Sequence, residues 1–137
     1  MTDTPIVLFV CVHNAGRSQM AAGFMRELSG GSVEVRSGGS EPGNQINPMA
    51  IAVMAEEGID ISQAVPQLMT TEQVRDSDVV ITMGCGDSCP VFPGKRYEDW
   101  ELTDPAGLSL NEVRPIRDEI KRRVTALLEE ISVTRPA

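Results

Sequence analysis

The chain has 137 residues, a usual length for one domain with its own hydrophobic core, and we expect residues 1–137 to form one domain. Hydrophobic residues make up 41% of the chain and charged residues 23%, and no apolar run approaches the roughly 20 residues that cross a bilayer. The net charge of −8 argues against nucleic acids and anionic membranes as partners, because both bind clustered Lys and Arg. A small anionic ligand would need local donors that overcome this overall field.

The N-terminus and the cysteines bear on the cellular compartment. Residues 1–5 contain an acid and no base and lead directly into an apolar run, which is not the pattern of a signal peptide, so we expect a cytoplasmic protein. The three cysteines are an odd number, and structural disulfides are rare in a reducing compartment. Reactivity or burial must therefore account for them.

The first predicted element is a strand over residues 6–10, an apolar run rich in β-formers that is typical of a strand buried on both faces. Cys11 follows at its carboxyl end. Residues 18–28 carry apolar side chains at helical spacing and predict a helix. A short loop that contains Gly16 thus connects the strand to the helix.

The remaining elements continue this alternation: a strand at 33–37, helices at 48–57 and 71–75, strands at 79–83 and 96–100, and a long helix from about residue 109. Residues 84–94, dense in Gly, Pro and Cys, are predicted to form a loop. This order predicts an open parallel sheet with helices on both faces, in which ligands bind beyond the carboxyl ends of the strands. Cys11, Cys85 and Asp104 all follow predicted strands, so we expect them to converge at that end.

Residues 11–18, Cys-Val-His-Asn-Ala-Gly-Arg-Ser, have the form C-x5-R-S between the strand and the helix. Such a loop can curl with its backbone N–H groups inward, and the following helix adds its positive end. The Arg17 guanidinium can hold two oxygens of a tetrahedral oxyanion. The predicted oxyanion-binding residues are Val12, His13, Asn14, Ala15, Gly16, Arg17 and Ser18.

The same donors favour the thiolate form of Cys11, and a thiolate that faces a bound oxyanion is a nucleophile. The alternative is a buried structural cysteine beside an incidental arginine, which the strand-loop-helix context disfavours. Asp104 is a candidate general acid, because the oxygen expelled by the attack needs a proton. The alternative for Asp104 is a turn residue, since Asp-Pro is common in turns.

The loop and Asp104-Pro105 resemble the low-molecular-weight tyrosine phosphatases and, within that family, the thioredoxin-coupled arsenate reductases. Further matching stretches are Ser-Gln-Met-Ala at 18–21, Asn47-Pro48, Asp-Ile-Ser at 60–62, Cys89-Pro90, Asp-Pro-Ala-Gly at 104–107 and Arg-Asp-Glu-Ile at 117–120. The resemblance implies a four-stranded parallel sheet, Cys11 as nucleophile, Arg17 and the loop amides as oxyanion binders, and Asp104 as general acid. It also implies Asn14 and Ser18 as supporting residues, to which we add Ser37.

Three thiols favour a reductase over a phosphatase, because a phosphatase needs only one cysteine and water whereas a reductase must find two electrons. Cys85 or Cys89 could attack the Cys11–arsenic adduct, release arsenite and leave a disulfide for an external reductant. The resemblance suggests that Cys85 attacks first and that Cys89 resolves the disulfide. A zinc pair is disfavoured because zinc normally needs four ligands and His13 is the only histidine, and inert loop cysteines are the other alternative.

We expect no bound cofactor and no metal, and an external thiol as reductant. Only three residues separate Cys85 from Cys89, a shorter gap than in the thioredoxin-coupled relatives. The reductant is therefore either thioredoxin or a low-molecular-weight thiol such as mycothiol with its mycoredoxin. Ala22 stands where many relatives carry a glutamate associated with potassium, so that cation is not expected. Arsenate is the expected substrate, with phosphate and sulfate as analogues.

Two other functions remain open from the sequence. A protein tyrosine phosphatase is disfavoured by Ala106 and Gly107, which stand where phosphatases of this fold carry aromatic residues. A non-catalytic oxyanion or arsenite sensor could use the three thiols as soft ligands. Asp104 argues against the sensor, because a binding protein needs no proton donor.

Overall fold

The computed structural model describes residues 4–83 and 94–134. Its elements in chain order are β1 (Ile6–Cys11), α1 (Arg17–Ser29), β2 (Glu34–Gly39), α2 (Pro48–Ala55), α3 (Thr71–Asp76), β3 (Val79–Met83), β4 (Arg96–Asp99) and α4 (Leu110–Thr134). The four strands form one sheet in the order β2-β1-β3-β4, and every neighbouring pair is parallel. The predicted four-stranded parallel sheet is therefore confirmed.

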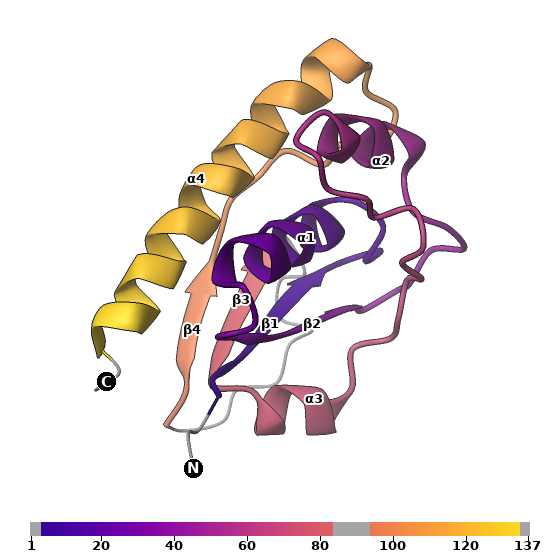
Figure 1. The fold of residues 1–137 in the computed structure, drawn as a ribbon. Coiled ribbons are helices and arrows are strands. Elements are labelled where there is room, and N and C mark those ends of the chain that lie inside the picture. Colours follow the sequence, from indigo (N-terminus) through magenta and orange to yellow (C-terminus); the bar gives the residue numbers. More distant parts are fainter. Residues whose placement is uncertain (1–3, 84–93, 135–137) are drawn as a thin grey trace.

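Helices cover both faces of the sheet, as the alternation predicts (Figure 1). Val7, Phe9 and Cys11 of β1 belong to the large core cluster, which also contains buried side chains of α1, α2 and α4. The alternate residues Leu8 and Val10 belong to a smaller cluster with Val74 of α3. Because successive strand residues point to opposite faces, β1 is buried on both sides, which explains its unbroken apolar run.

The predicted second strand, at 33–37, ends too early. The observed β2 continues through Gly38 and Gly39, which pair with Val10 and Cys11 of β1. Both positions need glycine because other parts of the backbone come close to them. A Cβ at Gly38 would lie 2.9 Å from the Met69 Cα, and one at Gly39 would lie 2.6 Å from the Val12 oxygen. These glycines therefore bring β2 against the loop that follows β1.

The other boundaries differ little from the predictions. The second helix ends at Ala55, two residues before the predicted end, and Gly58 follows with a positive φ of 77°. The last helix begins at Leu110, as expected near residue 109. Residues 84–93 of the predicted loop lie outside the described residues. Among those that are described, no helix is both long enough and apolar enough to cross a membrane.

An ion cluster connects the end of α2 to α4. Glu56 accepts hydrogen bonds from Arg114 at 2.7 Å and from Arg117 at 2.6 Å, and Arg117 also donates to the Val53 carbonyl at 2.9 Å. The hydrogen bonds from Arg114 and then Arg117 lower the pKa of Glu56 from its usual 4.5 to about 2. The charged carboxylate therefore stabilises the contact between the two helices.

This cluster predicts an acid-sensitive contribution to stability. Because the folded pKa is the lower one, the contribution is complete above pH 4.5 and is lost as the pH falls toward about 2. The free energy of unfolding, measured by urea denaturation across this range, should decrease less with acidification in Glu56→Gln than in the wild type. Glu57→Gln removes a carboxylate that accepts from Lys121 at 2.7 Å and controls for the loss of one surface charge. Equal acid sensitivity in Glu56→Gln and the wild type would contradict the prediction.

Candidate active site

The carbonyl groups of the loop between β1 and α1 accept hydrogen bonds from the segment that follows β2. There are three such backbone hydrogen bonds: Glu41 N–H donates to the Val12 oxygen at 2.8 Å, Gly43 to His13 at 2.9 Å and Asn47 to Ala15 at 2.8 Å. In a trans peptide the N–H group of the next residue points opposite to the carbonyl. The N–H groups of His13, Asn14 and Gly16 consequently point away from these partners, as an oxyanion cradle requires.

Cys11 lies at the end of β1 and is buried, with 2% of its surface exposed. Its sulfur lies 2.9 Å from the Oγ of Ser18, and Ser18 Oγ accepts a hydrogen bond from the Asn14 amide nitrogen at 2.7 Å. The hydroxyl hydrogen of Ser18 is then available to the sulfur, and a hydrogen bond donated to a thiolate stabilises the charged form. The predicted supporting residue Ser18 thus lies against the predicted nucleophile, and Asn14 lies against Ser18.

Arg17 and Asp104 lie beside each other at this loop. The Arg17 side chain is 9% exposed and that of Asp104 is 51% exposed, and Nη2 of Arg17 lies 3.7 Å from Oδ2 of Asp104. Arg17 also donates to the Leu102 carbonyl at 3.3 Å. The segment after Asp104 packs on the loop, because a Cβ at Gly16 would lie 2.8 Å from Cγ of Pro105. A buried guanidinium and a solvent-accessible carboxyl group therefore lie next to each other at this loop.

Comparison with known proteins shows the family of the chain. The model of the low molecular weight phosphotyrosine protein phosphatase family matches residues 6–136. The chain belongs to this family. The chain is 43% identical over 129 residues to the glutaredoxin arsenate reductase of Synechocystis sp.. This match covers 92% of this chain and 98% of that protein. A putative arsenate reductase of Halobacterium salinarum is 39% identical over 130 residues, covering 90% of this chain and 91% of that protein.

A solved structure of the same family has the same fold. The thioredoxin-dependent arsenate reductase of Corynebacterium glutamicum is 46% identical and superimposes with a TM-score of 0.87. The match covers 98% of this chain and 65% of that protein, so the chain spans about two thirds of the length of that relative. These matches confirm the predicted resemblance to the phosphatase family and, within it, to arsenate reductases.

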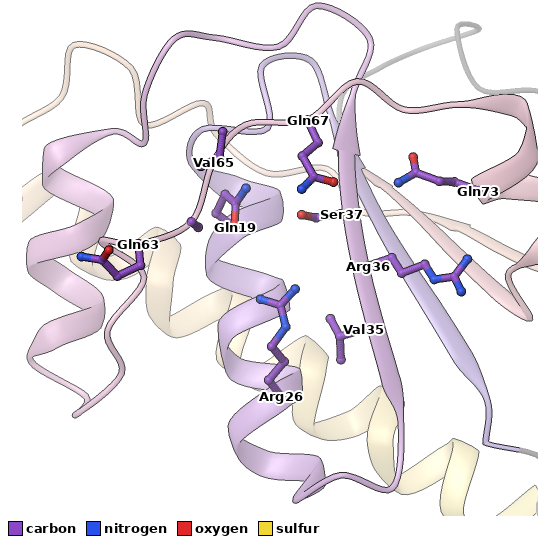
Figure 2. A pocket seen from close by; sticks show the side chains of 10 residues that line it. Gln19, Arg26, Val35, Arg36, Ser37, Gln63, Val65, Gln67 and Gln73 are labelled. Atoms are coloured by element: carbon purple, nitrogen blue, oxygen red, sulfur yellow. The ribbon is translucent and has the colours of Figure 1, made fainter.

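Two further predicted site residues, His13 and Ser37, do not contact Cys11 in the described part of the structure. His13 is exposed, and its Nδ1 lies 3.0 Å from the Glu41 carbonyl oxygen, so it also connects the loop to the segment that follows β2. Ser37 lies on β2, two residues before its end, and lines a pocket of about 550 Å³ that Gln19 and Gln67 also line (Figure 2). Ser37 pairs with Phe9 of β1, and among the described residues that line this pocket none belongs to residues 11–18, so the structure does not bring Ser37 to the Cys11 loop. Cys85 and Cys89 lie outside the described residues.

Sequence reasoning missed two contributors to the site. Gln19 is almost fully buried, at 2% exposure, and its amide contacts Asn14. The backbone N–H of Gln67 donates to the Asn14 side-chain oxygen at 2.9 Å. A glutamine in the first turn of a helix gives no sign that it is buried, and a backbone donor 53 residues away leaves no signal in the sequence.

The position of Asp104 predicts a loss of proton donation in Asp104→Asn. The rate of formation of the arsenic adduct at neutral pH should fall roughly 10²-fold or more, because the amide keeps the shape but has no carboxyl proton to give. The rate can be measured in a single turnover by rapid quench and mass spectrometry. Phosphate affinity, measured on the same variant, should survive. An unchanged single-turnover rate across pH would remove Asp104 from the mechanism.

Proposed function

We propose that this chain is a cytoplasmic arsenate reductase that uses Cys11 as its nucleophile. The observation that carries the proposal is the contact of the Cys11 sulfur with Ser18, beside the Arg17–Asp104 pair. The relatives named as arsenate reductases, at 43% and 46% identity, support arsenate as the substrate of such a loop. Phosphate and sulfate have a similar shape and charge and act as analogues.

In the first step the loop N–H groups and Arg17 hold the arsenate, and the Cys11 thiolate attacks arsenic. A sulfur–arsenic bond forms and one arsenic–oxygen bond breaks. The departing oxygen takes a proton from Asp104 and leaves as water. Arsenic is still pentavalent at this stage, so the step transfers no electrons.

In the second step the Cys85 thiolate attacks the sulfur of Cys11. A Cys11–Cys85 disulfide forms, the sulfur–arsenic bond breaks, and its electron pair stays on arsenic, which leaves as arsenite. Cys89 then attacks the Cys85 sulfur, which frees Cys11 and leaves a Cys85–Cys89 disulfide. An external dithiol restores both thiols, and no bound metal or organic cofactor is needed in this sequence.

This order predicts different trapped species in two variants. Cys89→Ser should complete one turnover and accumulate a Cys11–Cys85 disulfide, whereas Cys85→Ser should stop at the arsenic adduct. Mass spectrometry of alkylated protein after mixing with arsenate distinguishes the two products. Normal turnover of Cys89→Ser with thioredoxin, or a Cys11–Cys89 disulfide in Cys85→Ser, would show that the order is wrong.

The external reductant is the partner in this proposal. The thioredoxin dependence of the Corynebacterium relative makes thioredoxin the first candidate. The Synechocystis relative is a glutaredoxin arsenate reductase, so glutaredoxin is the second. Mycothiol with mycoredoxin is a further route that the assay must include.

The experiment follows arsenate-dependent NADPH oxidation and arsenite production with each of the three reductant systems, beside hydrolysis of p-nitrophenyl phosphate. We expect arsenite in the thioredoxin arm and slow hydrolysis of the aryl phosphate. Activity only with mycothiol and mycoredoxin would support arsenate reduction but would show that thioredoxin is not the reductant. Aryl phosphate hydrolysis with no arsenite in any arm would overturn the proposed function in favour of a phosphatase.

A further inference from the structure

Gln19 occupies an unusual place for an uncharged polar side chain. It lies in the first turn of α1, immediately after Ser18, and is 2% exposed. Its amide nitrogen donates to the backbone oxygen of Asn14 at 3.1 Å and to the side-chain oxygen of Asn14 at 3.0 Å. Both hydrogen bonds of this buried amide group therefore go to one residue of the Cys11 loop.

Asn14 has a backbone conformation that needs such support. Its φ is 51°, and within residues 4–83 and 94–134 it is the one residue other than glycine with a positive φ. This left-handed region is sterically unfavourable for side chains with a Cβ, although asparagine tolerates it better than most residues. Asn14 is also fully buried, so its oxygens cannot be satisfied by bulk water.

The hydrogen bonds fix which way the Asn14 amide points. The backbone N–H of Gln67 can only donate, so the atom that it contacts at 2.9 Å must be the Asn14 oxygen. The Asn14 nitrogen must then face Ser18, to which it donates at 2.7 Å. Likewise, the backbone oxygen of Asn14 can only accept, so the contacting atom of Gln19 must be its nitrogen.

We infer that Gln19 is a positioning residue for oxyanion binding and for the Cys11 nucleophile. It holds Asn14 in the left-handed conformation, Asn14 orients Ser18, and Ser18 lies 2.9 Å from the Cys11 sulfur. The inference rests on the proposed function only for the identity of the substrate, because the same loop would bind any tetrahedral oxyanion.

Gln19→Met tests this inference, because methionine keeps the length and burial of the side chain and removes both donors. The probe is inorganic phosphate, and its apparent Kd is measured as protection of Cys11 from iodoacetamide, followed by mass spectrometry. We expect the Kd for phosphate to rise about tenfold or more, since the buried backbone oxygen of Asn14 loses the Gln19 donor and its side-chain oxygen keeps only the Gln67 N–H. Cys11 alkylation without phosphate should slow as well, because Asn14, which donates to Ser18, has lost the support of Gln19. Gln19→Glu, which keeps the shape and loses the donors, should behave similarly if Gln19→Met does not fold.

Gln63→Met is the matched control. Gln63 lines the same pocket as Gln19 but is exposed (Figure 2), and within the described residues its amide donates a single hydrogen bond, to Ser62 at 3.5 Å. We expect this variant to keep the wild-type Kd and alkylation rate. A phosphate Kd in Gln19→Met equal to that of Gln63→Met would overturn the inference and leave the proposed function intact. A wild type that phosphate does not protect at all would overturn both.

A double-mutant cycle separates positioning from a general structural role. Asn14→Gly keeps the left-handed backbone accessible and removes the amide through which Gln19 acts on Ser18. If Gln19 acts through Asn14, adding Gln19→Met to Asn14→Gly should raise the phosphate Kd much less than it does in the wild type. Fully multiplicative effects of the two substitutions would contradict the inference.

Discussion

Replacing Cys11 by serine should lower arsenate reduction by roughly 10⁴-fold or more while the fold survives, because a neutral hydroxyl replaces the activated thiolate. The substitution is nearly isosteric, and a hydroxyl at this buried position can still form a hydrogen bond with Ser18. The loop N–H groups and Arg17 are untouched, so phosphate should still bind. Steady-state arsenite production with thioredoxin measures the loss, and calorimetry measures phosphate binding.

The two readouts on Cys11→Ser separate chemistry from binding. Lost turnover with retained phosphate affinity assigns the nucleophile to Cys11. Loss of both would point to a collapsed loop, which circular dichroism and the thermal midpoint would reveal. Retention of arsenate reduction in a folded Cys11→Ser variant would refute the assignment.

Arg17→Lys should lower kcat/KM for arsenate by roughly 10²–10³-fold, although the positive charge is kept. The Arg17 side chain is largely buried between the Leu102 carbonyl and Asp104. A planar guanidinium in this place can contact the carbonyl and still present a fork to two oxyanion oxygens. A lysine ammonium has three donors around one atom and cannot reproduce that fork.

Arg26→Lys is the matched control for Arg17→Lys, because Arg26 lies later on the same helix and lines the pocket beside β2 (Figure 2). Steady-state kinetics with arsenate should give near-wild-type values for Arg26→Lys and a large loss for Arg17→Lys. Near-normal KM and kcat in Arg17→Lys would show that Arg17 does not clamp the oxyanion.

The parts of the structure that were predictable from the sequence depend on local patterns. The unbroken apolar run of β1 and the helical spacing after Ser18 place Cys11 and Arg17 at the two ends of one short loop, and the structure has this loop. Asp104 was also placed correctly at the same end of the sheet, because parallel strands end together.

The parts that were missed depend on contacts between distant segments. Gly38 and Gly39 look like the start of a loop, yet they continue β2. They are glycines because Met69 and Val12 approach them too closely for any side chain. Gln19 looks like an ordinary surface residue of a helix, yet it is buried against the left-handed Asn14. Neither packing arrangement leaves a periodic pattern that sequence reasoning could detect.

Arsenate reduction by the chain's own cysteines can be tested directly in a single turnover without any external reductant. The fully reduced chain is mixed with arsenate under anaerobic conditions, and arsenite and protein thiols are quantified together. We expect about one arsenite per chain, with the loss of two thiols to one intramolecular disulfide, and no arsenite from Cys11→Ser. Intact thiols and no arsenite in the wild type would contradict it.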